Sequence, residues 1–190
     1  EVNLAYTARE YDIAVRYHRD MGLNMIRNWV GQIGDDELYE ACDKYGVVIW
    51  QDFCLANPSD GPDPSDNRMF MDNSRDVVYR VRNHPSIGLW CGRNEGNPPR
   101  KLELALNEMV TLLCPNSIYI TSSSDYCVSG RGPYHTMTPR EIYSIELGKY
   151  KFHSERGEVC IPSYESLCRM FREEHRWPQN DVWAMHNFTL

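Results

Sequence analysis

The stretch Ser86–Gly96, SIGLWCGRNEG, decides the fold. It begins as an apolar run typical of a buried strand and ends in Asn94-Glu95-Gly96, so a carboxylate follows the strand with a small residue behind it. The preceding His84-Pro85 step ends a helix, because proline disfavours the α conformation of the residue before it. The sequence therefore predicts a helix, a buried strand and a polar group at the carboxyl end of that strand.

Helices and strands alternate on both sides of this stretch. We expect strands over 24–29, 47–52, 87–91 and 118–122, with two further strands near 133–137 and 150–153. We expect helices over 8–21, from 35–36 to 45, over 74–83, from 97 to about 113, and over 163–174, followed by an apolar run over 182–185. This alternation is typical of βαβ units with a parallel sheet.

A closed (β/α)₈ barrel and an open doubly wound sheet both fit the alternation. A doubly wound nucleotide-binding domain needs a glycine-rich turn after its first strand, and none of these strands is followed by G-x-G-x-x-G or a phosphate-binding loop. Polar residues instead follow several strands, where barrel enzymes hold their catalytic groups. These residues are Arg27 and Asn28, Asp52, Asn94 and Glu95, and Ser154 and Glu155. We therefore predict a (β/α)₈ TIM barrel of the α/β class.

Length, charge and hydropathy limit the organisation of the chain and its ligands. A (β/α)₈ barrel needs about 250 residues, and this chain has 190, so we expect one incomplete barrel domain over 1–190. The net charge of −7, with no basic run between aromatic residues, argues against nucleic acid as a partner. No apolar stretch approaches the ~20 residues of a membrane span. We expect a soluble protein of unknown compartment, periplasmic or secreted if a signal peptide lies upstream.

The cysteines and histidines form no metal-binding pattern. The sequence contains no C-x-x-C and no H-E-x-x-H, so we expect neither a metal site nor a cofactor. The seven cysteines are odd in number and several lie among apolar residues, which favours buried free thiols over a disulfide framework.

Two glutamates are the candidate catalytic residues. Glu95 ends the strand of the opening stretch, and Glu155 follows a second strand-like run in KYKFHSERG, 149–157. Two carboxyl groups on separate strands of one barrel can flank a single glycosidic bond. One must be protonated to assist the leaving oxygen, while the other stays ionised and attacks the anomeric carbon. Taken alone, Glu95 could equally be a solvated loop residue.

Four polar residues are candidates for substrate binding. Arg27 could hold a carboxylate such as Glu155 in bidentate geometry, or form an inter-strand salt bridge instead. Tyr134 could donate a hydrogen bond to Glu155, or pack on the surface. Asn94 could bind a sugar hydroxyl next to the reacting carbon, and Asp52 could bind another hydroxyl or cap a loop.

The tryptophans suggest sugar stacking, because the apolar face of a pyranose packs well on an indole. Trp50 and Trp90 lie within predicted strands and are expected in the core. Trp29 and Trp183 are the better candidates for contact with a sugar.

Four segments together resemble the catalytic barrel domain of the family 2 glycoside hydrolases. They are GLNMIRNW (22–29), DELYEACDKYGVVIWQDF (36–53), VRNHPSIGLWCGRNEGNPP (81–99) and KFHSERG (151–157). The resemblance implies that Glu95, after Asn94, is the general acid/base, that Glu155 is the nucleophile, and that Arg27 contacts this nucleophile.

Two further segments are more similar to the β-mannosidase and exo-β-glucosaminidase branch than to the β-galactosidases. They are GPYHTMTPREIY (132–143) and ESLCRMFREEHRWPQNDVW (165–183). The resemblance also implies that the first and last barrel strands and several β-sandwich domains belong to a longer parent chain. We therefore expect a fragment of a multidomain enzyme, with little activity on its own.

The leading hypothesis is a retaining exo-β-glycosidase that hydrolyses terminal β-linked sugars of an oligosaccharide or glycoside. Retention through a glycosyl-enzyme intermediate predicts carboxyl groups about 5–5.5 Å apart. The alternative is a non-catalytic carbohydrate-binding barrel that keeps the groove and lacks the chemistry.

Overall fold

The computed structural model describes residues 6–125, 128–135, 137–144, 150–157 and 161–186. The chain forms two compact units, Glu1–Asp125 and Tyr126–Leu190. Each unit has a hydrophobic core of its own.

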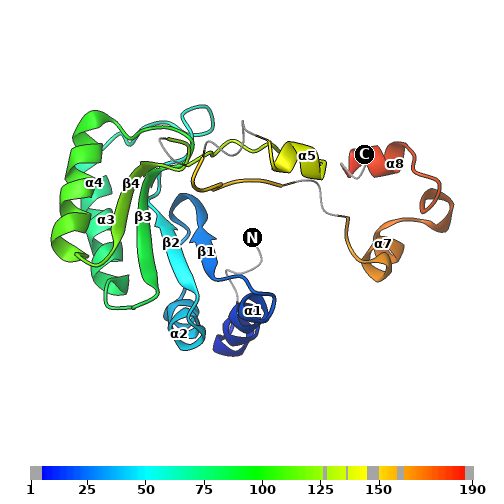
Figure 1. Cartoon of the computed structure of the whole chain (residues 1–190), viewed down its shortest axis with the longest axis horizontal. Helices are drawn as coiled ribbons and strands as arrows, with labels where there is room; N and C mark the ends of the chain where they lie inside the picture. The colour runs from blue at the N-terminus through cyan, green and yellow to red at the C-terminus, as the bar shows by residue number, and fades with distance from the viewer. Residues whose placement is uncertain (1–5, 126–127, 136, 145–149, 158–160, 187–190) are drawn as a thin grey trace. The chain divides into compact units, whose positions relative to one another are not determined.

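The first unit is a parallel four-stranded sheet in the order β1-β2-β3-β4, with the long helices on one of its faces (Figure 1). Its elements are α1 (Ala8–Asp20), β1 (Met25–Asn28), η2 (Trp29–Gly31), α2 (Asp36–Tyr45), β2 (Val48–Asp52), α3 (Asn67–Val81), β3 (Ile87–Arg93), α4 (Arg100–Leu113) and β4 (Ile118–Ser122). Each strand pairs with the next strand along the chain, so the α/β class and the predicted parallel sheet are confirmed for this unit.

Local chemistry explains where the helices begin and end. Thr7 caps α1 through a reciprocal capping box, in which its backbone N–H donates to Glu10 at 2.7 Å. Gly46 ends α2 in the left-handed conformation, with φ of 70°, which glycine adopts without the penalty of a Cβ atom. Helix α3 begins at Asn67, earlier than predicted, because the Asp66 carboxylate accepts hydrogen bonds from two backbone N–H groups of its first turn.

The core of the first unit lies between the helices and the sheet. Tyr39, Val78 and Leu106 from the helices are fully buried against Ile49 and Trp90 from the strands. Because side chains alternate along a strand, this packing leaves the residues between them for the opposite face of the sheet. That face carries the polar residues at the strand ends.

The second unit is built from short elements, and several predictions for it are wrong. It contains α5 (Pro139–Ile142), α7 (Tyr164–Met170), η3 (Glu173–His175) and α8 (Asp181–Met185). The described residues of 133–137 are not a strand, and 150–153 contributes one isolated bridge, from Phe152 to Val128. The helix expected over 163–174 ends at Phe171, whose backbone is extended. Short apolar runs without a partner strand do not fix their own secondary structure.

The helices that the structure describes, and its cysteines, bear on the predicted absence of a membrane span and on the predicted free thiols. None of those helices has both the length and the apolar character needed to cross a bilayer. All described cysteines are free thiols; Cys42, Cys91 and Cys114 are buried as expected, whereas Cys54 is exposed.

Candidate functional site

The carboxyl ends of three neighbouring strands bring together Arg27, Asp52 and Asn94. The Arg27 Nη2 atom lies 2.7 Å from Asp52 Oδ2 and 2.7 Å from Asn94 Oδ1. Sheet register explains this geometry, because Arg27 pairs with Trp50 and Asp52 lies two residues further along the same face. The guanidinium also lies over the Trp50 indole, 5.0 Å from the ring centre. The inter-strand salt bridge left open for Arg27 by the sequence is therefore present.

Asp52 is the buried centre of this group. Its side chain is 0% exposed, and its carboxylate accepts hydrogen bonds from Arg27, from Trp50 Nε1 at 2.7 Å and from the Val30 backbone N–H at 2.9 Å. A buried carboxylate needs such donors, because burial without them is costly. This geometry gives no support to Asp52 as a direct sugar ligand; the residue instead orients Arg27 and the turn after β1.

Asn28, the last residue of β1, faces the helices and is not part of the group formed by Arg27, Asp52 and Asn94. Its Nδ2 donates to Gln51 Oε1 at 2.8 Å, and Tyr39 donates to the same oxygen at 3.1 Å. Burial raises the pKa of Tyr39 to about 12. This neutral, buried network supports the packing of α2 on the sheet and is separate from the polar group of Arg27.

Glu95 lies in the turn directly after β3 and has a strained backbone. Its φ is +46°, a left-handed conformation that residues other than glycine rarely adopt. Its backbone N–H donates to Ser123 Oγ at 2.9 Å, and this hydroxyl donates to Asn94 Oδ1 at 3.2 Å. Ser123 is fully buried just after β4. The ends of two strands therefore fix the conformation of Glu95.

A loop that follows β2 lies beside Glu95. The Asn57 Nδ2 atom is 3.5 Å from Glu95 Oε2. A Cβ atom at Gly96 would lie 2.9 Å from Pro58 Cδ, so the close approach of this loop requires a glycine after Glu95. Sequence reasoning missed Asn57 and Ser123. The turn-rich stretch that contains Asn57 had no periodicity from which a contact could be predicted.

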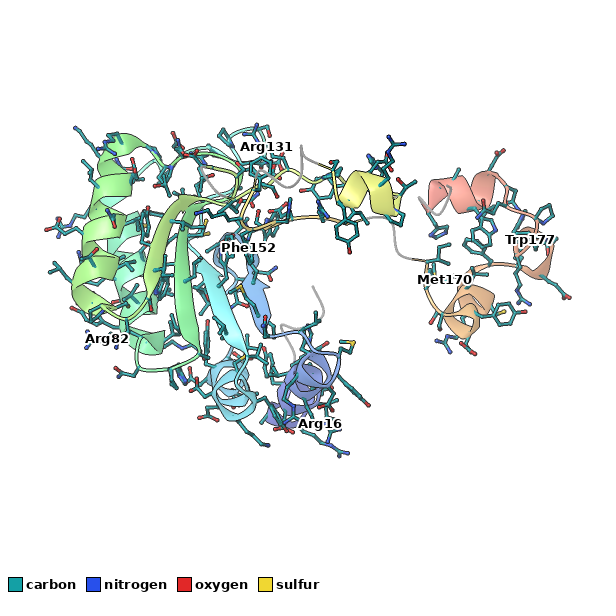
Figure 2. The ribbon with its side chains drawn as sticks, viewed as in Figure 1. Arg16, Arg82, Arg131, Phe152, Met170 and Trp177 are labelled. Carbon is teal, nitrogen blue, oxygen red and sulfur yellow. The ribbon has the colours of Figure 1, made fainter. Side chains whose placement is uncertain are left out.

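In the second unit, Glu155 lies on one of two segments that are paired side by side. Val128 and Phe152 form a parallel bridge, and the Gly130 N–H donates to Ser154 Oγ at 3.0 Å. Figure 2 labels Phe152 and Arg131, one on each segment. This pairing brings the residues around Glu155 close to the segment that carries Tyr134.

Tyr134 donates a hydrogen bond to Glu155, with 2.5 Å between Tyr134 Oη and Glu155 Oε2. This distance lies at the short end of the range for O–H···O hydrogen bonds. Gly132, with φ of 80°, makes the contact possible, since a Cβ atom there would lie 2.9 Å from the Tyr134 ring. Of the two possibilities that the sequence left open for Tyr134, the hydrogen bond to Glu155 is present, and the catalytic roles of both residues stay predictions.

The two tryptophans proposed as sugar contacts differ in exposure. Trp29 is 44% exposed next to the Asp52 group, whereas Trp183 is 6% exposed and packs on Phe171 in the small core of the second unit. Little of the Trp183 ring remains for a sugar, so the structure assigns it to packing. Trp177, labelled in Figure 2, is 76% exposed and is the indole of this unit that sequence reasoning did not select.

In the described ranges, no group of three or more His, Cys, Asp and Glu side chains could hold a metal ion. Burial, together with the nearby Asp52 charge, raises the pKa of the Cys91 thiol, which therefore stays protonated at neutral pH.

Two curated relatives are similar to most of this chain. β-Mannosidase B of Aspergillus clavatus is 41% identical over 86% of the chain, and the mannosylglycoprotein endo-β-mannosidase of Lilium longiflorum is 28% identical over 84%. The chain spans 24% and 21% of the lengths of these relatives, respectively. No family model matches the chain.

Two solved structures share its fold. The β-D-mannosidase of Dictyoglomus thermophilum superposes with a TM-score of 0.75 at 26% identity, over 96% of this chain and 26% of the other. The exo-chitosanase of Amycolatopsis orientalis gives a TM-score of 0.77 at 21% identity, over 90% of this chain and 23% of the other. These neighbours are TIM-barrel enzymes, which confirms the predicted barrel class, with the four parallel strands as one part of it. By its motifs and its relatives, the chain belongs to the family 2 glycoside hydrolases, and among them it is similar to β-mannosidases.

Proposed function

We propose that this chain carries both catalytic carboxyl groups of a retaining exo-β-glycosidase, a hydrolase of O-glycosyl bonds. Glu95 is the general acid/base and Glu155 is the nucleophile. The substrate class follows from the names of the relatives, which are β-mannosidases and an exo-chitosanase. We propose a terminal β-linked mannose or glucosamine unit of an oligosaccharide or glycoside.

The observation that carries this proposal is the backbone conformation of Glu95. A left-handed residue other than glycine costs about 1–3 kcal/mol and persists only where its surroundings enforce it. At Glu95 these surroundings are the buried Ser123 hydroxyl and the neighbouring Asn94. Such strain is typical of functional sites, and here it fixes the direction of a carboxyl group at the end of a barrel strand.

The contact between Tyr134 and Glu155 supports the role of nucleophile. A phenol that donates a hydrogen bond to a carboxylate stabilises its ionised form, and the ionised form attacks the anomeric carbon. Arg27, fixed by Asp52 and Asn94, is proposed as a second group that stabilises this negative charge.

In the proposed reaction, a Glu155 oxygen forms a bond to the anomeric carbon while the glycosidic C–O bond breaks. The departing oxygen takes the proton of Glu95. In the second step Glu95, now ionised, removes a proton from a water molecule whose oxygen attacks the anomeric carbon. The bond to Glu155 then breaks and the sugar leaves with its anomeric configuration retained.

We also propose that the chain is one part of a larger enzyme, because it spans about a quarter of the length of its relatives. The missing parts would supply the remaining barrel strands and the β-sandwich domains. Turnover of an aryl β-glycoside by the isolated 190 residues at the rate of the full-length protein would contradict this part of the proposal.

The full-length protein provides the test of the catalytic proposal. It should hydrolyse one member of a panel of aryl β-glycosides, and a mechanism-based fluoro-sugar of that glycoside should label Glu155, as seen by peptide mass spectrometry. Absence of turnover and of label would favour a non-catalytic carbohydrate-binding barrel. A product with inverted configuration, seen by NMR, would rule out the retaining mechanism.

A further inference from the structure

Polar contacts hold the loop that follows β2 against the end of β3, both before and after Asn57 in the sequence. The Asn94 backbone N–H donates to the Leu55 carbonyl at 3.0 Å, and Arg93 Nε donates to the Ala56 carbonyl at 2.7 Å. Further along the loop, Arg93 Nη1 lies 2.6 Å from Asp63 Oδ1. The Arg93 side chain is 4% exposed, so these contacts are made by a buried guanidinium. We call its contacts with Ala56 and Asp63 the Arg93 clamp.

The side chain of Asn57 does not stabilise this loop. The turn is closed by its backbone, since the Asn57 carbonyl accepts from the N–H groups of Asp60 at 3.0 Å and Gly61 at 3.2 Å. The amide Nδ2 instead points to Glu95 Oε2 at 3.5 Å. The amide Oδ1 is buried and has no hydrogen-bond partner in the part of the chain that the structure describes.

A buried amide oxygen without a partner needs a reason, because an unsatisfied acceptor costs about 1–3 kcal/mol. Its position beside Glu95 supplies one. We infer that Asn57 is a positioning residue, which holds the Glu95 carboxyl in the orientation needed to deliver its proton to the leaving oxygen. The Arg93 clamp fixes the loop, the loop presents the amide, and the amide restrains a carboxyl whose backbone is already fixed by Ser123.

This inference rests on the proposed role of Glu95 as general acid and makes a specific kinetic prediction. Protonation matters for a basic leaving group and hardly at all for an acidic phenol, which departs unassisted. Loss of Asn57 should therefore reduce kcat/KM, which reports the first chemical step, on the order of tenfold for a phenyl β-glycoside. For the dinitrophenyl β-glycoside of the same sugar, kcat/KM should remain within about twofold of the wild-type value, because that leaving group needs no proton.

The experiment compares variants of the full-length protein on these two substrates. Asn57→Leu keeps a similar side-chain volume, whereas Asn57→Ala removes most of it. If both variants lose the same rate, the loss comes from the missing amide and not from a change in packing. Ser59→Ala, an exposed position in the same loop whose hydroxyl contacts Asp60, is the matched control and should change neither rate. Asp63→Asn weakens the Arg93 clamp. It should lower kcat/KM for the phenyl glycoside by less than the Asn57 variants do and leave the dinitrophenyl glycoside nearly unaffected.

Glu95→Ala separates failure of this inference from failure of the proposed function. If Glu95→Ala loses activity selectively on the phenyl glycoside while both Asn57 variants equal the wild type, Asn57 has no positioning role and the acid assignment stands. Equal losses on both substrates in the Asn57 variants would show a structural role and also overturn the inference. If Glu95→Ala itself shows no dependence on the leaving group, the proposed acid is wrong and the inference falls with it.

Discussion

Glu95 and Glu155 are proposed to act on one bond, yet their surroundings differ strongly. Glu95 follows the seven-residue strand β3, whose last four residues are buried, and its turn is fixed by the fully buried Ser123. Glu155 follows a single isolated bridge and is held by Tyr134, which is itself 57% exposed. The first carboxyl depends on the core of a sheet, whereas the second depends on local contacts between two loops. Substitutions of the buried residues that fix the turn of Glu95 should therefore reduce stability, whereas those of Glu155 and Tyr134 should reduce activity with little change in stability.

The largest expected effect is that of Glu155→Gln. An amide cannot replace the attacking carboxylate, so kcat on an aryl β-glycoside should fall by roughly 10⁴-fold or more. Because the residue is partly exposed, the thermal unfolding midpoint of the full-length protein should hardly change. Substantial residual turnover by this variant would contradict the assignment of the nucleophile.

Asp52→Ala should give the largest loss of stability. It leaves the Arg27 guanidinium, with a side chain only 14% exposed, without its carboxylate, and such a change costs about 3–5 kcal/mol. Urea denaturation of the full-length protein measures this free energy. The control is Asp72→Ala, which breaks an exposed ion pair with Arg75 and should cost less than about 1 kcal/mol. Equal losses in the free energy of unfolding for the two variants would contradict the description of Asp52 as the buried ion-pair partner of Arg27.

Two tryptophans of the second unit test whether its small core matters. Trp183→Ala removes a buried indole and should destabilise by about 3 kcal/mol, whereas Trp177→Ala, at an exposed position, should stay within about 0.5 kcal/mol of the wild type. The melting temperatures of the two variants give the comparison. A greater loss for Trp177 than for Trp183 would reverse the assignment of core and surface.

Tyr134→Phe should reduce activity moderately and leave stability unchanged. It removes the donor to Glu155 and should lower kcat by roughly 10- to 100-fold, which corresponds to one hydrogen bond to a charged group. The measurement is kcat on the same aryl glycoside, with the melting temperature as control. A drop in melting temperature of several degrees would show that this tyrosine supports the fold of the second unit.

The smallest effect concerns the thiols of the first unit. Burial raises the pKa of Cys42 to about 12, so its reactive thiolate is scarce at pH 8 and becomes abundant only as the pH rises towards that value. Cys54 is exposed. Iodoacetamide at pH 8 should therefore label Cys54 and leave Cys42 unmodified, as read by peptide mass spectrometry; rapid labelling of Cys42 would indicate that the core of this unit opens.

The sequence by itself determined the regular part of the molecule. The alternation of apolar strands with amphipathic helices, and end signals such as Gly46 and His84-Pro85, gave the element order of the first unit and the position of Glu95 after a strand. These features are local in the chain, since periodicity and capping act over a few residues. The motif around Asn94-Glu95 also sufficed to indicate the family.

Only the tertiary structure decided which polar residues are buried and which partners they have. It made Asp52 an anchor for Arg27, buried Trp183, left Trp177 exposed and brought Asn57 to Glu95 from a loop without periodicity. The physical reason is that burial and hydrogen bonding depend on residues far apart in sequence, which strand pairing and loop packing bring into contact. A residue type and its position in a strand indicate where a side chain can point, and only its packed neighbours determine what it binds.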